Sequence, residues 1–389
     1  MFAITGVDGF EAAQAPLAPG MPILVGVSNV QSGPSSLLGK RLLAGSEAYF
    51  DRVNRQGGIY GHPIRLIVKD DRYEPDPAVK NTNELITKDH CFFLFDYVGT
   101  ATLTRVLPLL KFYEAEHVIN VAPFTGSDPQ HTAPYDKYVF SIRASYRGEA
   151  RVLVKFLHAK GYRRIGFLGQ ADAYGKNGEI AVREALAAFG LSLVESVTYR
   201  RNQPDSSGMR AQVQLLRAAR ADAVIVVGVY GPCAAFIRDA RLSGWNVPIA
   251  NVSFVGPESL LTTLEEESQR AGRDLATNLY TSQVVPSVHA LELPMVADYC
   301  HTVPPAERGP TSLEGWLNAV VVTEALRRSG PELTRLNLIH GLESLGDWDP
   351  GLGRTFGFSP TDHQGLSHVW LTKAEGGHWL PVEGSWEQP

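Results

Sequence analysis

The chain has 389 residues, and its 36 basic and 41 acidic residues leave a formal net charge of −5, too balanced for a protein that lives on nucleic acid. This length suggests two domains, and an apolar content of 44% is enough for each to form its own core. Cys91, Cys233 and Cys300 lie far apart, with no Cys/His cluster at metal spacing, so neither a disulfide framework nor a metal site is expected. No stretch reaches the roughly 18 apolar residues that a transmembrane helix needs.

The first 20 residues are ambiguous. They lack the basic region and the continuous apolar run of a secretory signal, yet Ala13-Gln14-Ala15 before Pro16 is typical of a signal-peptidase site. We interpret residues 1–20 as a truncated or re-engineered leader, with chance as the alternative.

From residue 22 onwards, short β-branched runs alternate with amphipathic helical stretches, the pattern of βαβ units and parallel sheets. The first series of predicted strands covers residues 22–30, 65–70, 92–98 and 118–124. The second series covers residues 164–169, 193–199, 223–228 and 248–254. Two α/β lobes are therefore expected.

The rhythm changes after Phe254. A strand is expected at 279–285, helices at 289–301, 312–328 and 334–345, and then a glycine-rich, β-like tail. Thr311-x-x-Glu314 is typical of a capping box at the start of the second of these helices. The simplest arrangement returns the chain to the first lobe near residue 284 and ends it with a small strand pair against the second lobe.

This arrangement predicts where the lobes divide. The N-terminal lobe would comprise residues 21–142 and 284–346, and the C-terminal lobe residues 143–283 and 347–389. Three crossovers, expected at 141–144, 282–285 and 351–357, would form a hinge.

The motifs of common enzymes are missing. Ser32 to Arg41 superficially suggests a phosphate-binding loop, but five residues separate its glycines instead of four, and Arg41 follows Lys40 where Ser or Thr is needed. There is no G-x-S-x-G elbow and no H-E-x-x-H helix. We therefore expect no cofactor, no metal and no catalytic residues.

Open α/β sheets bind ligands at the carboxyl ends of their strands, so the loops there are the candidate site. In the first lobe they are residues 29–36, 97–102 and 122–128, which are rich in hydroxyls and glycine. In the second lobe they are residues 170–176, 229–232 and 253–256, which offer aromatic walls. Hydroxyls and helix N-termini suit a carboxylate or another hydrogen-bond acceptor.

The order and spacing of several motifs resemble the type I periplasmic solute-binding proteins of the branched-chain amino acid (leucine/isoleucine/valine) class. The likeness runs from about Pro22 to His378. Its motifs are Ile23-Leu24-Val25-Gly26 with Ser32-Gly33-Pro34, Asn54-x-x-Gly57-Gly58-Ile59-x-Gly61, Asp70-Asp71 with Pro75-x-Pro77, Ala122-Pro123, Asp172-x-Tyr174-Gly175 and Arg220-Ala221-Asp222-Ala223-Val224. The resemblance implies two Rossmann-like lobes, joined by a three-crossover hinge, that close on a ligand in the cleft between them.

The resemblance also implies a set of ligand-binding residues. The family's carboxylate-binding loops fall on residues 99–102 and 124–125, where Thr100, Thr102 and Thr125 keep their hydroxyls. Together with the loop residues predicted to surround the cleft, the candidate set is Ser32, Gly33, Pro34, Tyr97, Thr100, Ala101, Thr102, Phe124, Thr125, Tyr146, Tyr174, Tyr230, Ser253 and Phe254.

The sequence departs from the family at one position. Where leucine-type binders place a glutamate for the ligand's ammonium, the ungapped match puts Ser253. A desolvated ammonium without an anionic partner would cost several kcal/mol, unless Asp96 or Asp172 substitutes. We therefore expect a ligand without a free α-ammonium: an aromatic or aliphatic carboxylate, an amide, or a larger apolar molecule such as a lipid or sterol.

The predicted function is a periplasmic, non-enzymatic and monomeric receptor that delivers a small molecule to a membrane transporter, with no nucleic-acid partner. The alternatives are an extracytoplasmic sensing subunit of a signalling receptor and a conventional amino-acid-binding protein. An enzyme on a two-lobe scaffold is disfavoured by the missing motifs.

Overall fold

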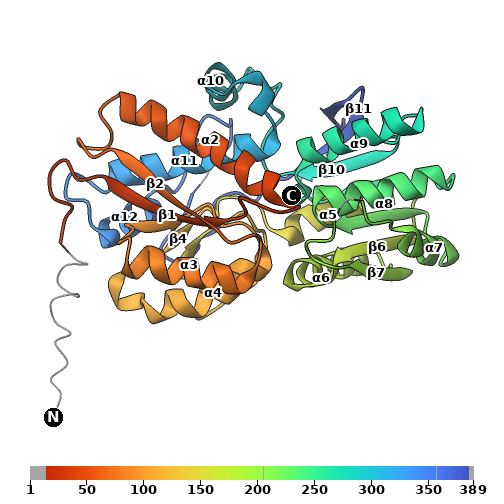
Figure 1. The fold of residues 1–389 in the computed structure, drawn as a ribbon, viewed down its shortest axis with the longest axis horizontal. Coiled ribbons are helices and arrows are strands. Elements are labelled where there is room, and N and C mark those ends of the chain that lie inside the picture. The colour runs from red at the N-terminus through yellow and green to blue at the C-terminus, as the bar shows by residue number, and fades with distance from the viewer. Residues whose placement is uncertain (1–14, 205, 356, 385–389) are drawn as a thin grey trace, which may run out of the picture.

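The computed structural model describes residues 15–204, 206–355 and 357–384, and these form two lobes side by side (Figure 1). Most of the expected leader, residues 1–14, lies outside the described residues. The first lobe contains the strands β1 (Ile23–Asn29), β2 (Ile64–Asp70), β3 (Phe93–Phe95), β4 (Asn120–Val121) and β5 (Val139–Phe140). They form one sheet in the order β2-β1-β3-β4-β5, and every pair in it is parallel.

The second lobe has a larger sheet in the order β12-β11-β10-β9-β8-β6-β7. Its strands are β6 (Ile165–Gln170), β7 (Glu195–Tyr199), β8 (Ala223–Val227), β9 (Ile249–Asn251), β10 (Leu279–Gln283), β11 (Trp370–Glu375) and β12 (His378–Pro381). β11 pairs antiparallel with β10, and β12 pairs antiparallel with β11, which confirms the predicted terminal strand pair.

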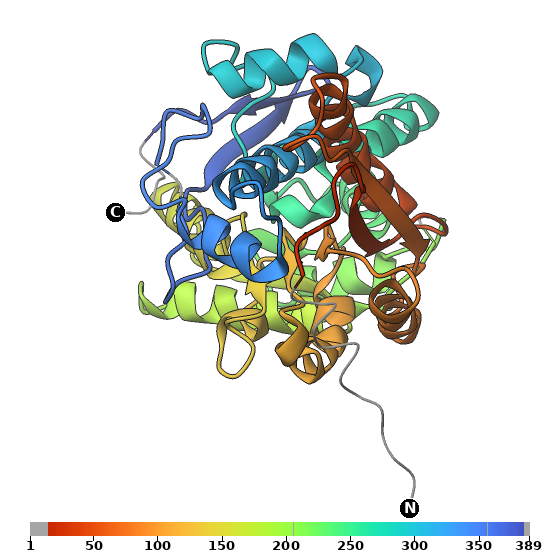
Figure 2. The ribbon, with the colours of Figure 1, turned by 90° about the vertical axis from the view of Figure 1, so that its left-hand side faces the viewer.

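Helices cover both faces of the first sheet, with α2 and α11 on one side and α3 and α4 on the other (Figures 1 and 2). The helices of this lobe are α2 (Ser36–Arg55), α3 (Pro75–Thr87), α4 (Thr100–Phe112), α10 (Pro294–Thr302), α11 (Pro310–Arg328) and α12 (Arg335–Glu343). Those of the second lobe are α5 (Tyr146–Ala159), α6 (Ala173–Ala187), α7 (Arg210–Ala218), α8 (Tyr230–Leu242) and α9 (Pro257–Ala271). Single 3₁₀ turns lie at η1 (Glu114–Glu116), η2 (Pro129–His131), η3 (Ser253–Val255) and η4 (Pro305–Glu307).

The α11 helix does not begin with the predicted capping box. Gly309 precedes its first residue, so Thr311 already lies inside the first turn. Glu314 is buried and faces Arg143 instead of the helix N-terminus. The predicted cap residue Glu314 is therefore a buried charge on the inner face of the helix.

The chain crosses between the lobes three times: after β5, after β10, and before β11. The third crossing differs from the expected position at 351–357. Leu352, Phe358 and Leu366 are still packed in the core of the first lobe, and Ser141 is bridged to Gln364. Apolar side chains therefore hold this segment on the first lobe, and we propose that the final lobe boundary follows Leu366.

One of the hydrophobic cores contains residues from both lobes. The second-lobe core includes Val30, Leu38 and Tyr73 from the first lobe. At Gly256, φ is +76°, which favours glycine, and an added Cβ would lie 2.8 Å from a Leu38 methyl group of the other lobe. The described structure is therefore the closed arrangement.

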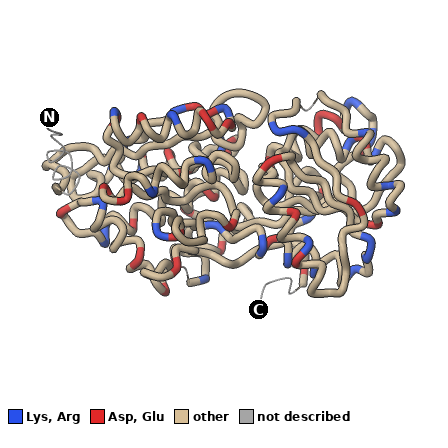
Figure 3. Tube along the Cα trace, turned by 90° about the horizontal axis from the view of Figure 1, so that it is seen from below, with Lys and Arg blue, Asp and Glu red and all other residues tan. Residues whose placement is uncertain are grey.

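Seen from below, acidic and basic residues are interspersed along the traces of both lobes (Figure 3). Within residues 15–384, apart from the two omitted positions, no helix combines the length and apolarity needed to span a bilayer. The same part of the chain holds no group of three or more His, Cys, Asp or Glu side chains suited to a metal ion.

Candidate functional site

The loops at the carboxyl ends of the two sheets meet between the lobes. Ser145 caps α5 by accepting from the Gly148 amide at 3.2 Å, and Asp172 caps α6 by accepting from the Tyr174 amide at 2.9 Å. These caps fix where each helix begins and hence where the first-turn residues Tyr146 and Tyr174 point. Across the interface, the Tyr230 hydroxyl donates to the Pro34 carbonyl at 2.6 Å.

A group of buried hydroxyls lies on the first-lobe side of the interface. The hydroxyl oxygens of Thr100 and Thr125 are 2.7 Å apart, and the Tyr146 hydroxyl lies 3.5 Å from Thr100 and 3.4 Å from Thr125. Burial raises the pKa of Tyr146 to about 12, so its hydroxyl keeps its proton. The group can donate to an acceptor that replaces one of these mutual contacts.

Aromatic rings form the other half of the interface. The Phe254 ring lies 4.9 Å from Phe124 and 4.5 Å from Tyr174, and Tyr174 lies 5.4 Å from Tyr146. Tyr73, which the sequence analysis did not select, joins them 6.3 Å from Phe254. All five side chains are buried, and together they form a dry wall between the lobes.

The most unexpected feature of the interface is a buried cation. Arg143, at the first crossover, is only 2% exposed and stacks over the Phe124 ring at 4.6 Å. Its guanidinium donates to the Ser253 hydroxyl, and it lies 3.5 Å from a Glu149 oxygen and 3.6 Å from a Glu314 oxygen. Burial lowers the pKa of Arg143, but Glu314 and Glu149 raise it more, so the group is cationic.

Hydrogen bonds use only part of this network. Glu149 accepts from the Ser253 amide at 2.7 Å and from the Ser282 hydroxyl at 2.6 Å, both through one oxygen. Within the described residues, Nε and Nη1 of Arg143 have no hydrogen-bond partner, and neither has the other Glu149 oxygen. Of the two nitrogens, Nη1 lies 3.6 Å from Glu314, whereas Nε has no such contact. Since buried donors are normally paired, Nε is available to an acceptor.

The comparisons with known proteins identify the family. A model described as periplasmic binding protein matches residues 22–378. This chain belongs to the periplasmic binding protein family. The branched-chain class recognised in the sequence, and the two-lobe fold expected from it, are confirmed.

Two solved structures cover nearly all of this periplasmic binding protein. A possible leucine/isoleucine/valine-binding protein from Rhodopirellula baltica is 29% identical, covers 95% of this chain and 98% of its own, and has a TM-score of 0.85. A substrate-binding periplasmic protein from Ralstonia solanacearum is 30% identical, with coverages of 90% and 97% and a TM-score of 0.81.

Among curated relatives, an amino acid binding protein of Pseudomonas aeruginosa is 25% identical over 245 residues, which are 62% of this chain and 63% of that protein. The alignment therefore spans less than two thirds of that relative's length.

Not all of the candidate residues of this periplasmic binding protein lie together. The Tyr97 side chain packs in a separate core of the first lobe, where its hydroxyl lies 3.0 Å from that of Thr82. Thr102 donates back to Gly99 in its own helical turn at 2.8 Å, and Ala101 is half-buried on α4. Ser32, Gly33 and Pro34 are exposed at the rim, where the Ser32 hydroxyl donates to Asp70.

The two acids considered as substitutes for the missing glutamate are already used. Asp96 accepts from the Asn318 amide at 2.7 Å and from the Ser46 hydroxyl, and burial raises its pKa. Asp172 caps α6 and accepts from Gln170 at 2.7 Å. Neither carboxylate is free to receive an ammonium.

Proposed function

We propose that this chain is the substrate-binding protein of an ABC-type membrane transporter, acts in the periplasm, is not an enzyme, and binds a ligand that lacks a free α-ammonium. The ligand is an aromatic or aliphatic carboxylate, an amide, or a larger apolar molecule with an acceptor at one end. The observation that carries this proposal is the buried Arg143, with its unpaired Nε, beside the aromatic wall.

Charge favours an acceptor over an ammonium at this position. A guanidinium does not lose its proton in proteins, and it donates in a planar fork that suits a carboxylate. An ammonium placed here would meet this cation and would have to compete with it for Glu149 and Glu314. The Thr100 and Thr125 hydroxyls provide further donors to the same acceptor.

The proposed mechanism is hinge closure. The ligand would first meet the hydroxyls of the first lobe, and the second lobe would then bring Phe254 and Tyr174 over its body. Closure also forms contacts at the rim, where Tyr230 reaches Pro34, and Arg201 lies 2.8 Å from Glu74. A membrane partner would recognise the closed pair of lobes.

Matched ligands test the proposal. Isothermal titration should detect 4-methylpentanoate or 3-phenylpropanoate, whereas leucine and phenylalanine, which differ from them by the α-ammonium, should bind at least about tenfold more weakly. Micromolar binding of leucine or glutamate would contradict the proposal. It would favour the second candidate, a conventional amino-acid-binding protein, which the names of the relatives support.

A substitution sharpens this test. Ser253→Glu restores an acid where leucine-type binders have one, and we expect it to gain measurable affinity for an α-amino acid and to lose affinity for the carboxylates. Thr87→Glu, which replaces a hydroxyl residue by glutamate at an exposed helical position, should do neither. If Ser253→Glu does not gain this affinity, the correspondence between Ser253 and the family's glutamate is wrong.

A further inference from the structure

The buried charges at the junction of the lobes are unequal in number. One guanidinium, that of Arg143, faces two carboxyl groups, those of Glu149 at 3.5 Å and Glu314 at 3.6 Å. All three side chains are at most 5% exposed. When both carboxyl groups are ionised, this cluster carries one net negative charge before any ligand enters.

A ligand carboxylate would add a second negative charge. Bound to the unpaired Nε of Arg143, it would be the third carboxyl group around one guanidinium, beside a wall of buried aromatic rings. Burial of a charge without a counter-charge is costly, and a titratable group in that position changes its protonation state instead. Binding of an anion therefore favours the uptake of a proton by the cluster.

Hydrogen bonds indicate which carboxyl group takes the proton. Glu149 accepts from the Ser253 amide at 2.7 Å and from the Ser282 hydroxyl at 2.6 Å, and such bonds stabilise its ionised form. Glu314 faces the Arg143 guanidinium at 3.6 Å, which is beyond hydrogen-bond distance. Of these two carboxyl groups, Glu314 is therefore the easier to protonate.

The charged and titratable groups that act on Glu314 come from four segments. They are Arg143 in the first crossover, Glu149 on α5, Glu258 on α9 and Asp96 directly after β3. Burial raises the pKa of Glu314 to about 7, Arg143 lowers it, and the two glutamates raise it further. A carboxyl group with a pKa near 7 changes its proton occupancy when a charge arrives at neutral pH.

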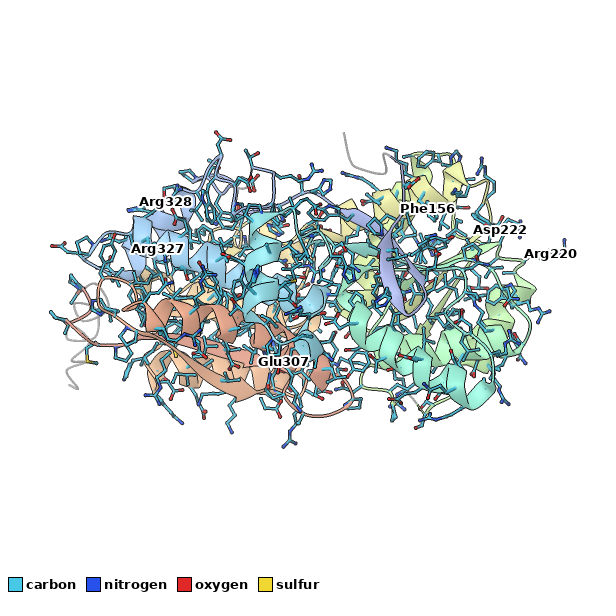
Figure 4. All side chains as sticks on the ribbon, turned by 90° about the horizontal axis from the view of Figure 1, so that it is seen from above. Phe156, Arg220, Asp222, Glu307, Arg327 and Arg328 are labelled. Atoms are coloured by element: carbon cyan, nitrogen blue, oxygen red, sulfur yellow. The ribbon has the colours of Figure 1, made fainter. Side chains whose placement is uncertain are left out.

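Glu314 lies in the half of α11 that is nearer the second lobe. Figure 4 labels Glu307, just before this helix, near the border between the lobes, and Arg327 and Arg328, at its end, on the outer side of the first lobe. The second acid of α11, Glu324, lies one turn before Arg328 and pairs with it. The two glutamates of this helix are therefore a matched pair for an experiment.

We propose that the interlobe site takes up a proton from the solvent when it binds a carboxylate, and that Glu314 holds this proton. The inference rests on the proposed function, because it needs an anionic ligand at Arg143. With Glu314 neutral, the ligand carboxylate shares the guanidinium only with Glu149. An uncharged amide adds no charge to the cluster and needs no proton. The affinity for carboxylates, but not for amides, therefore falls as the pH rises.

Isothermal titration of the full chain in buffers of different ionisation enthalpy measures the number of protons taken up. A second carboxylate should raise the pKa of Glu314 by about one to two units. We therefore expect 4-methylpentanoate to bring about 0.4 to 0.8 proton at pH 8, and to bind about tenfold to fiftyfold more tightly at pH 6 than at pH 9. The uncharged match, 4-methylpentanamide, should bind without proton uptake.

The two glutamates of α11 show where the proton goes. Glu314→Gln is permanently uncharged at this position, so it should bind 4-methylpentanoate without proton uptake and with an affinity that no longer depends on pH. Glu324→Gln should behave like the unaltered chain. If Glu314→Gln does not fold, infrared difference spectra of the unaltered chain replace it. At pH 8, the carboxylate should increase the absorption of a protonated carboxyl group, and the amide should not.

The outcomes separate this inference from the proposed function. Binding of 4-methylpentanoate at pH 8 without proton uptake overturns the inference and leaves the proposed function intact. Proton uptake that survives in Glu314→Gln overturns the assignment to Glu314. If neither the carboxylate nor the amide binds at any pH, the proposed function fails, and the inference fails with it.

Discussion

Two regions at the junction of the lobes bury glutamates, and they differ in what faces them. Between the lobes, Glu149 and Glu314 lie within 4 Å of Arg143. At the start of α9, the neighbour of the buried Glu258 carboxyl is Thr311, a neutral residue. The first region thus pairs its carboxyls with a cation, whereas the second places a hydroxyl beside its carboxyl.

The difference suggests how a closed two-lobe protein selects the charge of its ligands. Where the chain supplies a buried cation with an unpaired nitrogen, the group that completes the site is an acceptor. In both places burial raises the pKa of a glutamate and an arginine opposes the shift, Arg143 at Glu314 and Arg41 at Glu258.

Removing the buried cation Arg143 should have the largest effect on the free energy of unfolding. Arg143→Met leaves Glu149 and Glu314 buried without a counter-charge, and breaking a buried pair in this way typically costs about 3–5 kcal/mol of unfolding free energy. Urea denaturation followed by circular dichroism measures this loss. Arg147→Met, which removes a partly exposed arginine paired with Asp128, should cost under about 1 kcal/mol. Equal losses in the two variants would show that Arg143 is no more important than a surface arginine.

The carboxyl of Glu314 should make stability depend on pH. Burial raises its pKa from 4.5 to about 7, although Arg143 lowers it. Because the folded state holds this proton more tightly than the unfolded state, the contribution is complete below about pH 4.5 and is lost as the pH rises to about 7. The difference in unfolding free energy between the unaltered chain and Glu314→Gln should therefore change by up to about 3 kcal/mol across this range.

The comparison between variants isolates this one group. Asp71, in the first lobe, also has its pKa raised to about 7 by burial, but it titrates in both proteins and cancels in the difference. Glu324→Gln, on the outer part of α11, should reproduce the pH profile of the unaltered chain. A flat difference for Glu314→Gln would mean that Arg143 keeps Glu314 ionised throughout.

Much of the fold could be predicted from sequence because its signals are local. The strands and helices follow from apolar periodicity, and the loops that carry Thr100, Thr125, Tyr174 and Phe254 follow from the rule that parallel strands end at one edge. The structure brings these four residues together, and their contact with a ligand remains a prediction.

The charged part of the site could not be found in this way. Arg143 lies in a crossover that the sequence marks only as a connection, and Glu314 has the spacing of a capping box. Their interaction depends on the closure of two lobes over a long separation in sequence, which no local pattern encodes.

The smallest expected effect concerns the rim, where the lobes are held by partly exposed polar contacts. Glu74 lies 2.8 Å from the Arg201 guanidinium and accepts from the Asn202 amide at 2.8 Å, and both partners come from the other lobe. The side chains of Arg201 and Glu74 are 21% and 42% exposed, so this ion pair should contribute about 0.5–1 kcal/mol to closure. Glu74→Gln should therefore reduce the ratio of closed to open molecules without ligand by about twofold to fivefold, and less at high salt. Distance distributions between spin labels on the two lobes measure the closed and open populations.

Glu84→Gln, which removes ion pairs to Lys69 and Lys88 within the first lobe, is the matched control and should leave the distribution unchanged. An unchanged distribution in Glu74→Gln as well would mean that the buried core between the lobes, and not the rim, sets the closing equilibrium.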